Sequence, residues 1–129
     1  MILLDTCAVI WDALDPERLS RKAKSAIARS EDELIICDIS LWEIAMLIEK
    51  RRLVIAEPAG GFLKLVLRAR NFFVQEITPE IAELSATLDA SLGGDPADRL
   101  IAATSMVLNA PVITADARLL QAGVLRTIW

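Results

Sequence analysis

The stretch "MILLDTCAVIWDAL", residues 1–14, contains the unit from which the fold can be predicted. Its first four residues form an unbroken apolar run that ends at Asp5, which is typical of a short buried strand. The run "CAVIWDAL" at 7–14 has an apolar spacing that is compatible with a helix. The stretch therefore predicts a strand that leads into a helix, with an aspartate where the two meet.

The same alternation continues to the end of the chain. Further strand-like runs cover 33–37, 72–77, 111–116 and 125–129. Helical patterns lie between them: from Pro16 to about Arg29, around 41–48, from just after the Gly60–Gly61 pair to about Arg70, from Pro79 to about Leu88, over 95–108, and just after Asp116. Alternating strands and helices predict an α/β fold of three α/β/α layers with a central, mostly parallel sheet. In such sheets ligands bind beyond the carboxyl ends of the strands, where the strand order reverses.

Length and composition limit the organisation of the chain. A chain of 129 residues has the length of one domain, so we expect 1–129 to form a single domain. Mean hydropathy is high at +0.45, yet charged residues interrupt each apolar run well before the roughly 20 residues of a membrane span. The first residues lack the basic start of a signal peptide. We therefore expect a cytoplasmic protein with no membrane segment.

The absence of histidine limits the chemistry. It excludes Ser-His and Cys-His triads and most imidazole acid–base schemes. Two cysteines, Cys7 and Cys37, are too few for a disulfide framework or, without histidine, for a zinc site, and we expect both to be small buried hydrophobes. Carboxylates, lysines and a metal ion remain as the chemical agents.

Basic residues are unevenly distributed. The net charge of −4 argues against a protein that coats nucleic acid non-specifically. The segment 18–29 nevertheless contains five basic residues and no acid: Arg18, Arg21, Lys22, Lys24 and Arg29. Taken alone, such a cluster is typical of a solvated helix face.

Four acidic residues occupy the positions where a ligand is expected. They are Asp5, Glu43, Asp98 and Asp116. Asp5 and Asp116 follow strands, whereas Glu43 and Asp98 lie in the first turns of helices. Each also has a purely structural interpretation as a helix-capping group, with Glu43 pairing with Ser40 in the capping box "SLWE". Asp95 suits an N-cap, although a direct metal role stays open.

Electrostatics argues against capping as the whole explanation. If the sheet brings the strand ends together, these carboxylates converge, and two like charges about 4 Å apart repel by roughly 4 kcal/mol at an effective dielectric near 20. Capping needs no such crowding, because Ser, Thr or Asn caps without charge. A divalent cation turns the repulsion into attraction. Oxygen ligands without His or Cys partners point to Mg²⁺ or Mn²⁺.

Four motifs carry a family resemblance when they are taken in order. "LLDTCAVIW", "SLWEIAMLIEK", "DPADRLIAATS" and "VITADARLL" resemble the PIN-domain ribonucleases, specifically the toxins of VapBC toxin–antitoxin pairs, along essentially the whole chain. The resemblance implies a PIN-like α/β/α domain and a Mg²⁺- or Mn²⁺-dependent endoribonuclease site. In that pattern the catalytic and metal-binding acids correspond to Asp5, Glu43, Asp98 and Asp116. Thr6, Asp95 and Thr114 correspond to auxiliary positions. Cys7 and Ala97 depart from the pattern and leave the RNA preference open.

The resemblance also suggests a mechanism. We expect Asp5, Asp98 and Asp116 to hold one or two metal ions that activate a water for attack on a phosphodiester. Glu43 either completes the metal shell or orients that water. Because an acidic site repels RNA, the basic side chains are candidates for a backbone track. These are Arg18, Arg21, Lys22 and Lys24, with Arg99 either in contact with a phosphate or in a surface ion pair.

Partners follow only from the resemblance. It implies a cognate VapB-like antitoxin, whose C-terminal segment folds into a groove near the site, and a homodimer. Trp11, Trp42, Leu47 and Leu53 are either core or part of that groove. The alternative function is a non-catalytic PIN-like module that binds RNA or protein. The RNA target, the cleavage sequence and any action on DNA are not encoded in these motifs.

Overall fold

A computed structural model describes residues 1–29 and 32–129. Its five-stranded sheet is parallel throughout, in the order β3-β2-β1-β4-β5. The strands are β1 (Ile2–Leu4), β2 (Leu34–Cys37), β3 (Phe73–Gln75), β4 (Val112–Ile113) and β5 (Thr127–Ile128). The chain starts in the middle of the sheet, builds it outward to β3, and returns to the other side of β1. The strand order therefore reverses between β1 and β4.

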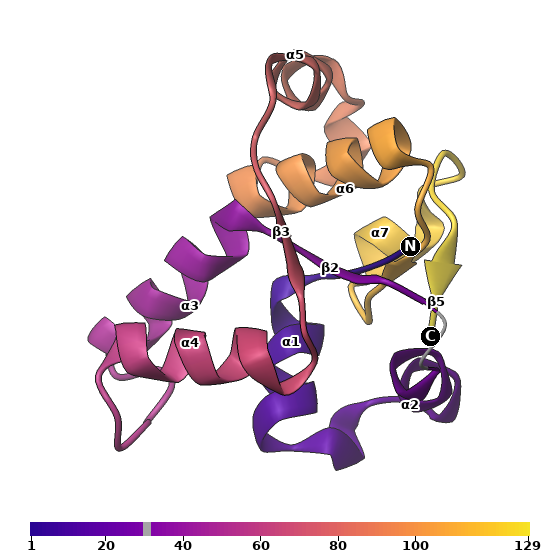
Figure 1. The fold of residues 1–129 in the computed structure, drawn as a ribbon. Coiled ribbons are helices and arrows are strands. Elements are labelled where there is room, and N and C mark those ends of the chain that lie inside the picture. The colour runs from indigo at the N-terminus through magenta and orange to yellow at the C-terminus, as the bar shows by residue number, and fades with distance from the viewer. Residues whose placement is uncertain (30–31) are drawn as a thin grey trace.

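Helices cover both faces of this sheet (Figure 1). They are α1 (Thr6–Leu14), α2 (Arg21–Ala28), α3 (Asp38–Glu49), α4 (Ala59–Ala69), α5 (Pro79–Thr87), α6 (Pro96–Leu108) and α7 (Ala117–Gln121), with 3₁₀ turns η1 (Pro16–Arg18) and η2 (Ala90–Leu92). The predicted three-layer α/β/α fold is confirmed.

The core follows the alternation of side chains along the strands. Ile2 and Leu4 of β1 pack with α1 to α4, whereas Leu3 between them faces α6 and contacts Ile101. Successive residues of a strand point to opposite faces, so the short run at 2–4 supplies both layers. This double burial explains why the run is apolar without interruption.

The segment from Pro16 to Arg29 corrects one predicted element. It forms η1 and α2 rather than one helix, because Leu19 leaves the helical path and is buried in the core. Ser20 then caps α2, since its hydroxyl accepts a hydrogen bond from the Ala23 amide at 3.0 Å. Residues 30 and 31, part of the loop expected before the strand at 33–37, lie outside the described residues.

Two further boundaries differ from the prediction. The helix α3 begins at Asp38 instead of after Ser40, so Ser40 is not an N-cap and "SLWE" is not a capping box. Gly60 and Gly61 lie inside the first turn of α4 rather than before it. In α6 the buried positions are mostly small residues together with Ile101 and Thr104, while Leu100, Val107 and Leu108 are half-buried. In the described residues, no helix is long and apolar enough to cross a membrane.

Candidate active site

A pocket of about 390 Å³ lies beyond the carboxyl ends of β1 and β4, where the strand order reverses. This is the location at which open parallel sheets bind ligands. The pocket is lined by Asp5, Thr6, Cys7, Trp11, Glu43, Leu47, Asp95, Asp98, Ala115 and Asp116. The structure therefore brings all four predicted acids, together with Asp95 and Thr6, into one cavity.

Two of the four predicted acids cap helices with a single carboxylate oxygen. Oδ1 of Asp5 accepts a hydrogen bond from the Ala8 amide at 2.8 Å, which starts α1. Oδ1 of Asp116 accepts from the Arg118 and Leu119 amides at 2.9 and 3.3 Å, which starts α7. The capping interpretation is thus confirmed for Asp5 and Asp116. Each carboxylate nevertheless has a second oxygen that these bonds do not use.

Asp95 and Asp98 differ in their hydrogen bonds. Oδ1 of Asp95 accepts from the Asp98 amide at 3.2 Å, so Asp95 is the N-cap of α6, as predicted. The Asp98 side chain makes no hydrogen bond to any residue that the structure describes, and neither does that of Glu43. Capping therefore accounts for Asp95 but not for Asp98 or Glu43.

Buried hydroxyls connect the elements that carry the acids. The Thr6 and Ser40 hydroxyls lie 2.9 Å apart and join the first turn of α1 to that of α3. Thr6 follows Asp5, and Ser40 precedes Glu43 by one helical turn. The Thr114 hydroxyl is fully buried and accepts from the Asp116 amide at 3.0 Å. The pairing of Ser40 with Thr6 was not foreseen, because nothing in the sequence distinguishes it from a capping serine.

The carboxylates raise one another's proton affinity. Partial burial, then the charges of Asp95, Asp116, Glu43 and Asp5, raise the pKa of Asp98 from 3.8 to about 7. Burial also raises the pKa of Asp5, although the Thr114 hydroxyl and the Ala8 amide oppose this shift. At neutral pH the carboxylates of the pocket therefore repel one another, and a bound cation would relieve this repulsion.

The pocket also has an apolar wall, which includes two residues that the sequence placed either in the core or in a groove near the site, Trp11 and Leu47. Cys7 and Trp11 contribute from α1, and Leu47 contributes from α3. Cys37 is buried as expected, but Cys7 is exposed, which corrects the expectation of two buried cysteines. Desolvation and the neighbouring carboxylates raise the pKa of the Cys7 thiol to about 11, so it stays protonated at neutral pH. The i, i+4 spacing of Cys7 and Trp11 is a signal that reveals their shared face.

Arg99 lies away from this pocket. Its guanidinium donates to the backbone carbonyls of Ser85, Leu88 and Gly93 at 3.0, 2.6 and 3.0 Å, with a longer bond to Asp89. It thereby closes the end of α5 onto the start of α6. No ion pair forms between Arg99 and any residue that the structure describes, which differs from the surface ion pair that the sequence suggested.

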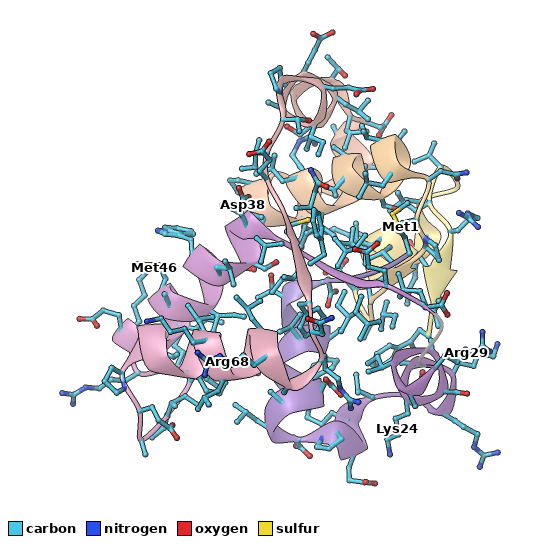
Figure 2. The ribbon with its side chains drawn as sticks, viewed as in Figure 1. Met1, Lys24, Arg29, Asp38, Met46 and Arg68 are labelled. Carbon is cyan, nitrogen blue, oxygen red and sulfur yellow. The ribbon has the colours of Figure 1, made fainter. Side chains whose placement is uncertain are left out.

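The other basic candidates lie on η1 and α2, where Arg18, Arg21 and Lys22 are exposed. Lys24 forms an exposed ion pair with Glu17 at 3.4 Å. The Arg18 guanidinium lies over the Trp11 ring, 4.8 Å from its centroid. In Figure 2 Lys24 and Arg29 project from α2 toward the outside of the molecule. Arg18 is thus the basic residue in direct contact with the wall of the pocket.

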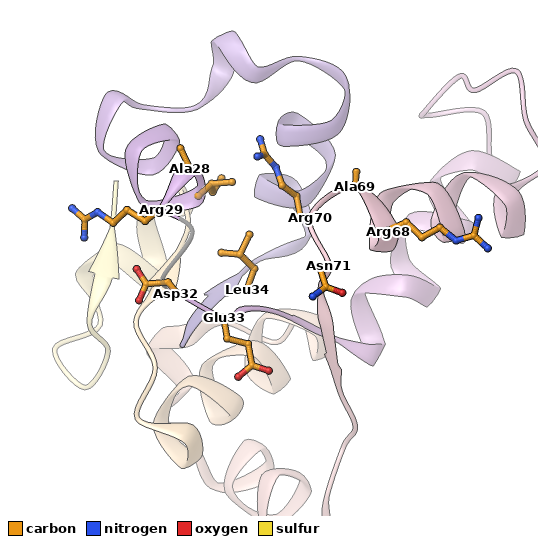
Figure 3. Close-up of a pocket in the computed structure, with 10 residues that line it drawn as sticks. Ala28, Arg29, Asp32, Glu33, Leu34, Arg68, Ala69, Arg70 and Asn71 are labelled. Carbon is orange, nitrogen blue, oxygen red and sulfur yellow. The ribbon is translucent and has the colours of Figure 1, made fainter.

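A larger cavity of about 650 Å³ lies at the opposite ends of β2 and β3. Its rim includes three arginines, but Arg70 is held by Asp12 at 2.9 Å. Figure 3 shows that Arg29 and Arg68 point away from each other. The cavity therefore lacks a set of converging polar groups, and the acidic pocket is the better candidate site.

The donors of the acidic pocket fit a hard divalent cation, because they are carboxylate oxygens with no imidazole. Within the described part of the chain, no group of three or more His, Cys, Asp or Glu side chains is arranged so that it could hold a metal ion. The fit therefore rests on donor chemistry and on the raised pKa of Asp98, and the carboxylates must draw closer to share a cation.

Comparisons with known proteins identify the family. Residues 2–125 match the PIN domain. The chain is 38% identical to Ribonuclease VapC22 of Mycobacterium tuberculosis over 118 residues, which cover 92% of this chain and 88% of that protein. The chain therefore belongs to the PIN domain family and is a relative of the VapC proteins, as its motifs indicated.

Solved structures agree on the fold. A chain of the DNA-bound VapBC from Salmonella typhimurium superposes with a TM-score of 0.75 at 17% identity, covering 98% of this chain and 95% of that one. A chain of VapBC2 from Rickettsia felis, bound to a DNA fragment from its promoter, gives 0.74 at 18% identity, with 98% and 97% covered. At these identities the likeness supports the fold alone.

Proposed function

We propose that this protein is a Mg²⁺- or Mn²⁺-dependent endoribonuclease and the toxin of a type II toxin–antitoxin pair. One observation carries the proposal: four carboxylates meet in one pocket at the switch point of a PIN-domain sheet, and the side chains of two of them, Glu43 and Asp98, make no hydrogen bond to any described residue. The relationship to Ribonuclease VapC22 supports RNA as the substrate.

Each acid has a role in this proposal. Asp5, Asp98 and Asp116 would hold the cation, and Glu43 would complete the shell or orient the attacking water. When bound, the cation supplies Lewis-acid stabilisation of the phosphodiester and lowers the pKa of water. Asp5 and Asp116 keep one oxygen on a helix N-terminus, which fixes their orientation.

The auxiliary residues position these acids. Thr6 and Ser40 set the separation of the turns that carry Asp5 and Glu43. Thr114 braces the Asp116 backbone and lies beside Asp5. Asp95 places Asp98 by starting α6 and raises its pKa. Arg99 acts through the α5–α6 connection rather than on RNA.

The partners are also part of the proposal. An apolar groove of about 400 Å³ lies between α1, the loop at 54–57 and α4, where Val54 is 88% exposed and Leu65 53%. A solved structure with the same fold is a toxin–antitoxin complex from Klebsiella pneumoniae. We assign this groove to the C-terminal segment of a VapB-like antitoxin, which would fold on binding, although none of the residues expected in such a groove lines it: Trp11, Trp42, Leu47 and Leu53. We further propose a cytoplasmic homodimer whose protomers each form one domain over 1–129.

Cleavage of a mixed RNA pool tests the enzyme. Purified protein without its partner should cut RNA with Mg²⁺ or Mn²⁺ and should stop in EDTA. Asp98→Asn should lower the rate on the order of 100-fold or more, since even partners outside the ligand shell cost 10–100-fold. Asp95→Asn keeps the N-cap, because Asn caps as well as Asp, and should retain cleavage within a few-fold.

A matched control uses the same chemical change outside the pocket. Glu83 is exposed on α5, so Glu83→Gln should cut at the wild-type rate. If folded protein cuts under neither metal, or if Asp98→Asn cuts like wild type, the nuclease proposal fails. A non-catalytic PIN-like module that binds RNA or protein would then replace it.

A further inference from the structure

The acidic pocket is continuous with an apolar wall built from two helices. Cys7 and Trp11 are four residues apart on α1, and Glu43 and Leu47 are four residues apart on α3, so each pair shares one helix face. Four residues advance a helix by about 6 Å. Trp11 therefore lies one helical turn beyond Cys7, and Leu47 one turn beyond Glu43, on the side away from the carboxylates. A base or sugar attached to the reacting phosphate would have room along this wall.

The Trp11 ring is held before any ligand arrives. The Arg18 guanidinium lies 4.8 Å from its centroid, and the Trp129 ring packs against it at 5.8 Å with an interplanar angle of 52°. Trp11 is half-buried yet lines the cavity. A ring fixed in this way loses little side-chain freedom on binding, which favours a recognition surface over a passive contact.

Arg18 supplies the charge that a polyanion requires near an acidic site. It is exposed and forms no ion pair with any of the described residues. Lys24, by comparison, is paired with Glu17. A cation stacked on an aromatic ring at the edge of a carboxylate pocket is complementary to a nucleotide, in which a flat base adjoins a phosphate.

We propose that Trp11 and Arg18 form a nucleotide subsite for single-stranded RNA, in which the indole contacts a base and the guanidinium contacts an adjacent phosphate. This inference rests on the proposed nuclease function and adds to it the residues that hold the strand beside the cleaved bond. The exposed cation favours RNA over an apolar peptide, because a peptide that covered Arg18 would need an acid to match it.

The test separates base contacts from backbone contacts. Binding is measured with Mg²⁺ in an Asp98→Asn background, which blocks cleavage, using a fluorescent uridine oligonucleotide and its abasic ribose-phosphate counterpart. Trp11→Leu keeps apolar volume without an aromatic face and should weaken binding of the uridine strand about tenfold. It should not change binding of the abasic strand. Trp11→Phe, which restores an aromatic face, should bind the uridine strand nearly as the parent does.

Two controls complete the experiment. Trp42 is 61% exposed on α3 and does not line the pocket, so Trp42→Leu should bind both strands like the parent. Arg18→Gln should lower the slope of log affinity against log salt by about 0.7, the value for one phosphate contact on a single strand. Thermal midpoints check that each variant is folded.

The outcomes are distinguishable. Parent-like binding by Trp11→Leu, or equal losses for both strands, overturns the subsite even if RNA cleavage is intact. Weakened capture of an antitoxin peptide with unchanged RNA binding also overturns it and assigns the wall to a protein partner. If Trp11 contributes to base-dependent binding but the protein does not cleave RNA, the subsite proposal stands and the nuclease proposal fails.

Discussion

For the acids of the pocket, the sequence presents helix capping and ligand binding as alternatives, yet one carboxylate can do both. Asp5 and Asp116 each cap a helix with Oδ1 and also line the pocket. Capping and ligand binding are therefore compatible for one carboxylate. Asp98 is different, because its side chain has no partner among the described residues and its pKa is raised to about 7.

The raised pKa of Asp98 predicts a pH-dependent stability. An unfolded aspartate loses its proton near pH 4, whereas folded Asp98 keeps it up to about pH 7. The folded state thus binds more protons between these values, and stability falls as pH rises through this window. In EDTA, the thermal midpoint of the wild type should therefore rise as pH is lowered from 8 to 5.5.

Asp98→Asn should reduce that pH dependence, because the amide does not titrate. Part of it should remain, since burial also raises the pKa of Asp5. Glu83→Gln removes an exposed carboxyl outside the pocket and should reproduce the wild-type curve. If the thermal midpoints of wild type and Asp98→Asn change equally with pH, the raised pKa of Asp98 is contradicted.

At the scale of helices and strands, most of the fold was predictable because each strand is a short apolar run bounded by helix signals. The site acids were predictable for a related reason: Asp5, Asp98 and Asp116 sit at strand ends or in a first turn, where a parallel sheet gathers them. Glu43 differs from the prediction, because α3 begins at Asp38 and places it in the second turn. The break at Leu19–Ser20 was missed because the burial of Leu19 is a tertiary effect. The role of Arg99 was missed because its four carbonyl partners come from the end of α5 and from the loop that follows it.

The contact between α1 and α3 predicts a coupled loss of stability. Removing one hydroxyl of the Thr6–Ser40 pair strands the other in the core, so Thr6→Val and Ser40→Ala should each cost about 1–3 kcal/mol in the free energy of unfolding. The double variant leaves no hydroxyl unsatisfied and should cost less than the sum. Urea unfolding of the four proteins measures the coupling, and additive losses would argue against the pair.

The connection between α5 and α6 predicts a second effect at this scale. Arg99→Gln removes the forked donor that holds the carbonyls of Ser85, Leu88 and Gly93, and should lower the free energy of unfolding by about 2 kcal/mol. Because α6 carries Asp98, cleavage should fall as well. The salt slope of RNA binding should stay unchanged, which distinguishes Arg99 from Arg18. A slope reduced by about 0.7 would instead place Arg99 on the RNA.

For the whole molecule, charge decides how RNA approaches. The protein carries a net charge of −4 and its candidate site is acidic, so a polyanion must be drawn in by a local basic surface. Arg21 and Lys22 are exposed on α2, next in the chain to the turn that carries Arg18. Figure 1 shows α2 near β5 and the C-terminus, and η1, which carries Arg18, connects α2 to α1 in the chain. We therefore expect this surface to extend the path that starts at the carboxylates.

Replacing two charges on this surface tests that path. In the Asp98→Asn background, Arg21→Gln/Lys22→Gln should lower the slope of log affinity against log salt by about 1.4, which corresponds to two phosphate contacts. Lys64→Gln/Arg68→Gln makes the same change in net charge on α4, where both side chains are exposed and neither lines the acidic pocket. The α4 pair should leave the slope unchanged. Equal effects of the two pairs would mean that RNA responds to net charge alone, and the α2 track would then be wrong.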